Sequence, residues 1–313
     1  MTSESQSTYL WWDGEIVEWE KTTVHITALG HLNTAATVYE GIRAYWNAEN
    51  EKLFVFRLQE HMKRFRDSMK LQRMEQPFTP EHLAVAVVDL LKANGFREDT
   101  YISPRAFFDP FGSWGTFVEN PKSTRVLIDA WLRPSRLSSG ESKHCCVSSW
   151  SRISDNVMPP RIKCLSNYQN SRLAAEEAHR NGYDGAIILD GRGKVSEGPG
   201  ACLFIVRDGV AITPSITSGI LESITRKTLI ELFGKELNVV AVEREMDRTE
   251  LYVAEEAFFC GTGGGEVTPI VSIDRHPLGT GSPGPLTESV RRLYHDVVRG
   301  RNPRHRHWLT QVD

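Results

Sequence analysis

The chain has 313 residues, which at roughly 150 residues per domain favours two domains. Its 37 lysines and arginines nearly balance its 40 aspartates and glutamates, and the net charge of −3 gives no general attraction to nucleic acids or anionic membranes. An apolar content of 40% is sufficient for a sizeable core. The sequence has no uncharged apolar run of about 18 residues, so no transmembrane helix is predicted.

The cysteines and the start of the chain bear on the compartment. The five cysteines, Cys145, Cys146, Cys164, Cys202 and Cys260, lack the spacing of a zinc site or a disulfide framework. The first eight residues have neither the basic start nor the apolar run of a secretory signal. We therefore expect a cytoplasmic protein without a metal centre.

Residues 1–133 predict a smaller N-terminal α+β domain. Strands are expected at residues 9–11, 16–18, 38–46, 53–57, 100–108 and 125–132. One helix is predicted over residues 59–69, where apolar side chains recur every three or four positions. A second is predicted from Pro80 to Lys92, because Thr79 is a favourable start and Asn94-Gly95 a favourable end.

Residues 134–143 are rich in Ser, Gly and Pro and predict an interdomain linker. A larger C-terminal domain is expected over residues 144–313, with strands at 145–150, 185–189, 203–207, 209–213, 238–243 and 256–260 and helices at 167–181, 225–233 and 289–299. The six arginines and three histidines of residues 291–307 predict a solvated tail and terminal helix, because the aromatic interleaving of a nucleic-acid surface is absent. The elements do not alternate as βαβ units, so a doubly wound nucleotide-binding fold fits poorly.

Two short patterns carry reactive side chains. Lys163 lies in a moderately apolar stretch just before a predicted helix. Most lysines are surface residues, but a desolvated lysine is the usual amine for a Schiff base. Glu197 follows a short strand inside a glycine turn. It is either a solvated turn residue or a carboxylate directed at a protonated ring nitrogen, with glycines that allow close backbone approach.

Two further patterns suit an anion. The polar turn at residues 219–226 opens the helix predicted at Thr225, and its backbone N–H groups and hydroxyls suit a phosphate, although such residues are often only helix caps. The glycine-rich residues 260–266 match neither a dinucleotide fingerprint nor a Walker A loop and form a second candidate anion-binding turn. An amine, a carboxylate for a pyridinium and two phosphate-binding turns together predict a pyridoxal 5′-phosphate site.

With these motifs, the chain resembles the class IV aminotransferases, which are fold-type IV pyridoxal phosphate enzymes, and among them most closely the branched-chain amino acid aminotransferases. The resemblance runs from about residue 9 to residue 312. Its most specific segments are residues 38–45 (Val-Tyr-Glu-Gly-Ile-Arg-Ala-Tyr), 56–64, 148–155, 181–184, 195–198, 224–226, 247–254 and 307–310.

The resemblance implies a two-domain α+β fold of the D-amino acid and branched-chain aminotransferase type. It implies a transaminase (EC 2.6.1-type) that moves an amino group from an amino acid or amine to a 2-oxo acid by a ping-pong mechanism. Lys163 would be the Schiff-base lysine and proton shuttle, Glu197 would hold the pyridine nitrogen protonated, and Tyr168 would face the phenolic oxygen. The phosphate would be bound by Arg64, Ile224, Thr225, Thr262 and Gly263. The resemblance also implies at least a homodimer, with no nucleic-acid or membrane partner.

The substrate side departs from the family pattern. Where branched-chain enzymes have a Tyr-Ile-Arg-Pro strand whose arginine receives the substrate carboxylate, this chain has Tyr101-Ile-Ser103-Pro-Arg105. Residues two apart on a strand share a face, so either Arg105 takes over a carboxylate or the carboxylate clamp is lost. Tyr39 and Arg43 complete the candidate substrate residues.

Other departures surround the same pocket. Thr34 stands in place of a pocket tyrosine, the Trp131-Leu-Arg-Pro turn differs from the family's Trp-Pro-Trp-Gly-like turn, and Arg161 adds a charge two residues before Lys163. The pattern indicates kept chemistry with altered specificity. Three alternatives stay open: an aminodeoxychorismate-lyase-like elimination enzyme, an (R)-amine or D-amino acid transaminase, and a binding protein that has lost catalysis.

Overall fold

The computed structural model describes residues 7–23, 36–109 and 120–312. Its helices and two sheets confirm the predicted α+β class. Contacts divide the chain into two compact units. Unit 1 comprises Met1–Pro134, Ile162–Ser166 and Val297–Asp313, and unit 2 comprises Ser135–Arg161 and Asn167–Asp296. Thr34, which the sequence analysis placed in the pocket, lies outside the described residues.

Unit 1 therefore includes Lys163 and the last residues, which the sequence analysis had expected in one continuous C-terminal domain. Backbone contacts explain the assignment of the lysine segment. The Leu165 N–H donates to the Thr37 carbonyl at 2.9 Å, and Cys164 forms an antiparallel bridge with Val38. The lysine segment is thus hydrogen-bonded to the N-terminal part of the chain.

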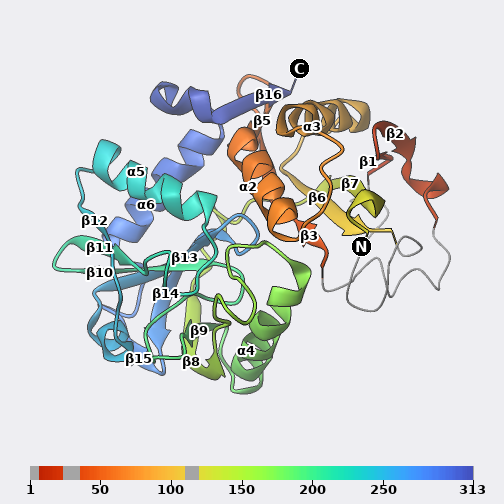
Figure 1. Cartoon of the computed structure of the whole chain (residues 1–313). Coiled ribbons are helices and arrows are strands. Elements are labelled where there is room, and N and C mark those ends of the chain that lie inside the picture. Colours follow the sequence, from red (N-terminus) through yellow and green to blue (C-terminus); the bar gives the residue numbers. More distant parts are fainter. Residues whose placement is uncertain (1–6, 24–35, 110–119, 313) are drawn as a thin grey trace. The chain divides into compact units, whose positions relative to one another are not determined.

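The sheet of unit 1 has the strand order β16-β5-β4-β6-β7-β1-β2, with β3 paired to β6. Figure 1 labels these strands except β4. Its strands are β1 (Tyr9–Trp12), β2 (Glu15–Glu18), β3 (Val38–Tyr39), β4 (Ile42–Asn47), β5 (Lys52–Phe56), β6 (Thr100–Phe108), β7 (Thr124–Leu132) and β16 (Leu309–Val312). The described pairs in this sheet are antiparallel. Short 3₁₀ helices lie at Trp19–Lys21, Pro121–Ser123, Leu165–Asn167 and Pro303–Trp308.

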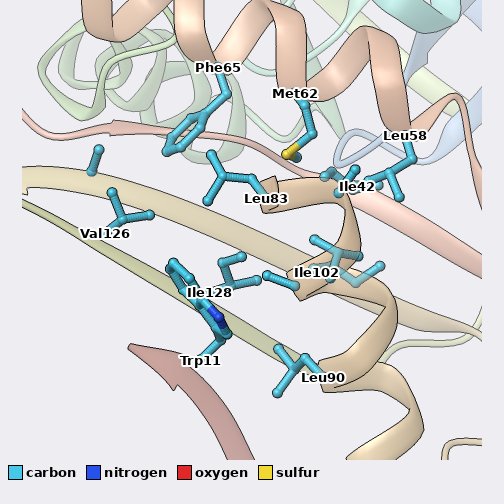
Figure 2. Packing of buried hydrophobic residues seen from close by; sticks show 14 of the residues in the cluster. Trp11, Ile42, Leu58, Met62, Phe65, Leu83, Leu90, Ile102, Val126 and Ile128 are labelled. Atoms are coloured by element: carbon cyan, nitrogen blue, oxygen red, sulfur yellow. The ribbon is translucent and has the colours of Figure 1, made fainter. Parts of the chain in front are cut away.

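The helices α2 (Leu58–Leu71) and α3 (Pro80–Asn94) cover one face of this sheet. Thr79 caps α3 by accepting from the His82 N–H at 3.2 Å, and Gly95 ends it with a φ of 62°. Figure 2 shows helix side chains such as Met62 and Leu83 packed against strand side chains such as Ile102. Because this apolar layer covers one face of the sheet, only the opposite face is available to contact a ligand.

Strand alternation places the candidate substrate residues on the other face. Ile42, Ile102 and Ile128 contribute to the helix-covered core (Figure 2). Successive strand side chains point to opposite faces, so Arg43, Tyr101, Ser103, Arg105 and Asp129 point away from the helices. The odd-numbered positions of β6 and β7 therefore form one surface opposite the core that mixes polar and aromatic side chains.

The single strand predicted over residues 38–46 is wrong, because Glu40 and Gly41 separate β3 from β4. A Cβ atom on Gly41 would overlap the hydroxyl of Tyr101, so only glycine fits beside β6 at this point. The Glu40 N–H donates to the Pro104 carbonyl at 2.8 Å. The interruption between β3 and β4 thus places Glu40 and Gly41 directly beside β6.

Unit 2 contains a sheet of order β12-β11-β10-β13-β14-β8-β9, with β15 paired to β14. Its strands are β8 (Lys143–Ser151), β9 (Gly185–Leu189), β10 (Cys202–Arg207), β11 (Val210–Thr213), β12 (Ala241–Glu243), β13 (Glu256–Gly261), β14 (Glu266–Ile273) and β15 (His276–Pro277). The helix α4 (Tyr168–Arg180) packs against β8 and β9, whereas α5 (Ile224–Glu236) packs against β13 and β12. A 3₁₀ helix lies at Arg248–Val253, and α6 spans Pro285–Val298, of which Val297 and Val298 belong to unit 1.

The sequence analysis missed β14. All eight of its residues are buried, and Pro269 interrupts the local sequence pattern of a strand. The preceding glycine-rich residues form the hairpin turn that joins β13 to β14. The turn was predicted correctly, but the strand that it introduces was not.

The predicted solvated tail is correct only in part: Arg301, Arg304, Arg306 and His307 are exposed, whereas His305 and Trp308 are buried. Residues 303–308 form a 3₁₀ helix, and β16 pairs with β5 in the sheet of unit 1. His305 and Trp308 are only 3% and 6% exposed, and the Arg57 guanidinium lies 3.9 Å from the centre of the Trp308 ring. Packing of Trp308 thus holds the segment against unit 1 although the segment is rich in arginine and histidine. In the described part of the chain, no helix is long and apolar enough to span a membrane.

Candidate active site

Lys163 is a buried lysine whose amine lies against an aromatic ring. Lys163 is 9% exposed, and its Nζ lies 4.4 Å from the centre of the Tyr39 ring. The Lys163 N–H donates to Ser68 Oγ at 3.2 Å, and its carbonyl accepts from the Tyr39 N–H at 2.9 Å. Contacts with α2 and β3 therefore fix the backbone from which the amine extends.

Arg64 belongs to a buried cluster with Glu40 and His61. Arg64 Nε and Nη2 donate to the two Glu40 carboxylate oxygens at 2.7 and 2.8 Å, and His61 Nδ1 lies 2.7 Å from Oε2. Residues 61 and 64 are three apart on α2, so both side chains reach the same side of the helix. The cluster fixes the guanidinium of Arg64 through a bidentate pair.

Electrostatics defines the protonation of this cluster. Burial alone would raise the pKa of the Glu40 carboxyl, but Arg64 and the hydrogen bonds from Arg64 and His61 lower that pKa to about 2. Burial lowers the pKa of His61 below its ordinary value, so the imidazole is neutral at pH 7. An ionised carboxylate only accepts hydrogen bonds, so His61 donates through Nδ1.

The candidate substrate residues line one sheet face of unit 1. Tyr39 lies opposite Arg105 in the β3–β6 pair, and Arg43 lies opposite Tyr101 in the β4–β6 pair. Arg43 is buried and donates to the Arg133 carbonyl at 3.0 Å. The Arg43 guanidinium is thus engaged by backbone.

Aromatic and cationic contacts border the same face. The Tyr101 ring centre lies 4.9 Å from the Trp131 ring centre, and the Arg133 guanidinium lies 4.9 Å from the Tyr101 ring. Arg105 pairs with Asp129 on β7 at 3.5 Å. Sequence reasoning missed Asp129, although an acid inside the apolar run Val126-Leu-Ile-Asp-Ala-Trp131 was a detectable signal.

Glu197 is a buried carboxylate in unit 2 that a buried arginine accompanies. Arg152 Nη2 lies 2.6 Å from Glu197 Oε1, and the Leu221 N–H donates to Oε2 at 3.2 Å. The Cys202 thiol also contacts Oε2 at 3.6 Å. Arg152 donates in turn to the Gly219 carbonyl at 3.0 Å, so the carboxylate is held from two sides. Sequence reasoning did not assign a role to Arg152.

The two predicted anion-binding turns meet in unit 2. Thr225 lies in the first turn of α5, where Ser223 accepts from the Arg226 N–H at 3.2 Å. Thr225 Oγ1 and Thr262 Oγ1 are 3.4 Å apart, so the start of α5 and the β13–β14 turn converge. A Cβ atom on Gly264 would lie 2.8 Å from the Gly200 carbonyl oxygen, which keeps that position glycine.

The remaining predicted residues are placed around these elements. Ile224 is the first residue of α5, Gly263 follows Thr262 in the hairpin turn, and Tyr168 begins α4. Arg161 lines a cavity of about 530 Å³ in unit 2 and pairs with Asp155 at 3.0 Å and Glu222 at 3.2 Å. Two carboxylates therefore compensate the extra charge of Arg161.

All five cysteines are buried thiols, and burial raises the pKa of Cys260 to about 12. Such thiols are poor nucleophiles. Among the residues that the structure describes, no group of three or more His, Cys, Asp or Glu side chains could hold a metal ion.

Comparison with known proteins gives extensive matches. The family model described as "Amino-transferase class IV" matches residues 37–273. A probable branched-chain-amino-acid aminotransferase of Aquifex aeolicus is 39% identical over 305 residues, which covers 97% of this chain and 96% of that protein. The similarity thus extends beyond the motifs of the site.

Solved structures agree with this result. The branched-chain amino acid aminotransferase from Thermobaculum terrenum in its PLP form has a TM-score of 0.95, with 47% identity and 99% coverage of both chains. The branched-chain aminotransferase from Thermoproteus uzoniensis with norvaline has a TM-score of 0.88 and 41% identity, covering 98% of this chain and 100% of that chain.

Proposed function

Because the chain belongs to the class IV aminotransferases, with their fold-type IV architecture, we propose that it transfers an amino group to a 2-oxo acid by a ping-pong mechanism with Lys163 as Schiff-base lysine. The chain is a branched-chain-aminotransferase-like transaminase that depends on pyridoxal 5′-phosphate. The observation that carries the proposed role of Lys163 is its buried amine, with Nζ 4.4 Å from the Tyr39 ring centre.

The residues present fit this cofactor. A buried lysine, a buried carboxylate and two converging threonine hydroxyls at a helix start are the groups that its aldehyde, ring nitrogen and phosphate require. Gly264, whose Cβ would approach the Gly200 carbonyl oxygen to 2.8 Å, keeps the turn beside Thr262 compact. When bound, pyridoxal phosphate supplies an electron sink for the negative charge that develops on the substrate carbon.

Lys163 would move the proton. Its Nζ is the basic atom that can take a proton from the substrate carbon and then release that proton to the cofactor. The Tyr39 ring limits where Nζ can lie. The anchored backbone at Ser68 and Tyr39 keeps this motion short.

Glu197 would hold a proton on the ring nitrogen of the cofactor. Its carboxylate is buried, and Arg152 compensates the charge through a 2.6 Å contact at Oε1. The Leu221 N–H at Oε2 further restricts its rotation. Tyr168 would face the phenolic oxygen.

Arg64, Ile224, Thr225, Thr262 and Gly263 would bind the phosphate. Thr225 and Ile224 supply a hydroxyl and backbone N–H groups at the start of α5, where the helix dipole favours an anion. Arg64 supplies a guanidinium whose direction Glu40 fixes.

For the substrate we propose a branched-chain L-amino acid and a 2-oxo acid, bound on the face that carries Tyr39, Arg43, Tyr101, Ser103 and Arg105. Arg105 would receive the second carboxylate of an acidic substrate, since Ser103 stands where the family has an arginine. The second candidate is an (R)-amine or D-amino acid transaminase or an aminodeoxychorismate-lyase-like enzyme. Ser103 in place of the clamp arginine favours the amine transaminase among these, because an amine substrate brings no carboxylate to be bound.

The experiment has two parts. Lys163→Ala should lower turnover by at least about 10³-fold and remove the visible absorbance of the lysine-bound cofactor, whereas the exposed Lys235→Ala should leave both unchanged. Retained turnover in Lys163→Ala would contradict the proposal.

The wild-type protein is then mixed separately with L-amino acids, D-amino acids and amines, and cofactor bleaching is followed. Bleaching confined to branched-chain L-amino acids supports the favoured substrate class. Bleaching by D-amino acids or amines supports the second candidate, as does pyruvate release without an acceptor.

We also propose a cytoplasmic homodimer. The five buried thiols support a reducing compartment, and the dimer rests on the family resemblance. Light scattering of the purified protein measures the assembly directly.

A further inference from the structure

Asp129 lies on the same sheet face as the candidate substrate residues of unit 1. The β6–β7 register places Asp129 opposite Ser103 and Leu127 opposite Arg105. Arg105 and Asp129 are therefore diagonal neighbours on one face, within reach of long side chains. Tyr39 lies opposite Arg105 on the other side of β6, and its ring contacts Lys163 Nζ. One continuous face thus connects the reacting amine to Asp129.

The Arg105–Asp129 pair is loosely made. The closest nitrogen–oxygen distance is 3.5 Å, and the side chains are 36% and 20% exposed. Asp129 Oδ1 is buried and has no hydrogen-bond partner among the described residues. Burial raises the pKa of the Asp129 carboxyl, an effect that the charge of Arg105 only partly opposes.

Stability does not account for an acid at this position. A partly exposed ion pair contributes little to stability, whereas an unsatisfied buried oxygen destabilises the fold. An apolar residue would fill this strand position, between Ile128 and Ala130, without that cost. A group that destabilises the fold and faces a binding surface points to a role in binding.

We propose that Asp129 sets the preference of the site between dicarboxylates and branched aliphatic monocarboxylates by competing with the ligand's second carboxylate for Arg105. The inference rests on the proposed function, because it takes this face as the substrate surface. Asp129 acts through Arg105 and is a positioning residue.

The competition follows from charge. A branched aliphatic ligand brings no charge to Arg105, so the Arg105–Asp129 pair stays closed and presents a neutral surface. A dicarboxylate draws the guanidinium toward its own second carboxylate and leaves Asp129 as a nearby like charge. The same face accepts both classes, and Asp129 reduces the affinity for the acidic one.

The test uses two ligands that cannot react, glutarate and 4-methylvalerate, titrated by calorimetry into the cofactor-loaded protein. Asp129→Asn should lower the Kd for glutarate about fivefold, because it removes both the competitor and the like charge. The Kd for 4-methylvalerate should change less than about twofold, since that ligand leaves the pair closed.

Two variants serve as controls. Asp109→Asn removes a carboxylate that pairs with Arg125 of β7 at 3.2 Å, and it should leave both Kd values unchanged. In the Arg105→Gln variant there is no guanidinium to compete for, so Asp129→Asn should improve glutarate binding only by removing the like charge. Asp129→Ser in the same Arg105→Gln variant removes that charge too and measures this smaller gain independently.

Three results would overturn the role of Asp129: an unchanged ratio of the two Kd values, an equal shift for both ligands, or glutarate binding too weak to measure in wild type and Asp129→Asn alike. A fivefold gain that persists unchanged in the Arg105→Gln background would also overturn it. Failure of the proposed function is separate, because it is the absence of cofactor bleaching by any amino donor in the wild-type protein.

Discussion

Arg64 and Arg105 are both guanidinium groups of unit 1 that pair with a carboxylate, and the two pairs differ in strength. Arg64 makes two hydrogen bonds of 2.7 and 2.8 Å to Glu40, which is completely buried and also contacts His61. Arg105 makes one 3.5 Å contact to Asp129, and one oxygen of that carboxylate has no described partner.

The difference matches what each residue is proposed to bind. A phosphate that is the same in every turnover is best met by a guanidinium held in one orientation, because little side-chain entropy is then lost on binding. A surface that meets two chemically different substrates benefits from a cation that can change partners. Tight pairing at Arg64 and loose pairing at Arg105 are therefore two solutions to two binding problems.

The largest expected effect comes from breaking the tight pair. Glu40→Gln should lower the free energy of unfolding by about 3 kcal/mol at pH 7, because it leaves Arg64 without its buried counter-charge. Urea unfolding measures the change. The pKa of Glu40 is about 2 against an ordinary 4.5, so the contribution of its carboxylate is complete above about pH 4.5 and is lost as the pH falls toward 2.

The pH dependence is the control for this variant. Wild type and Glu40→Gln should differ by a constant amount above pH 4.5 and converge as the solution is acidified toward pH 2. A difference that stays constant down to pH 2 would mean that the loss comes from altered packing, and the contrast between the two pairs would weaken.

An intermediate effect is expected at Gly41, which follows Glu40 of the tight pair and lies beside Tyr101 on the strand that carries Arg105. Gly41→Ala should lower the free energy of unfolding by about 2 kcal/mol, because its Cβ would overlap the Tyr101 hydroxyl. Thermal or urea unfolding measures the loss. Tyr101→Phe in the same chain should recover part of it, since the substitution removes the overlapping oxygen. No recovery in the double variant would contradict the steric explanation.

The smallest expected effect comes from the loose pair. Asp129→Asn should change the free energy of unfolding by less than about 1 kcal/mol, because a long, partly exposed ion pair contributes little. The same urea experiment compares it directly with Glu40→Gln. A loss as large as that of Glu40→Gln would make Asp129 a structural residue and remove the contrast.

Local patterns predicted much of the fold and the proposed site. The periodicity of α2, the Thr79 and Gly95 signals of α3 and the glycine turns next to Glu197 and Thr262 are encoded within a few residues, and the structure bears out these elements. The strand β14 was missed because Pro269 interrupts its local pattern, and the terminal strand β16 was missed because its partner β5 lies far away in sequence. β16 pairs with residues about 250 positions earlier, which no local window can detect.

The sequence by itself determined which chemical groups the protein carries: a lysine, a carboxylate and hydroxyl-rich turns in the order of a pyridoxal phosphate enzyme, with serine where the family has an arginine. The tertiary structure decided which groups meet. Glu40 reaches Arg64 because Glu40 and Gly41 interrupt the strand between β3 and β4, and Asp129 reaches Arg105 because of the β6–β7 register. The physical reason is that charge pairing acts through distances of a few ångström, and only the packing of separate strands and helices sets those distances.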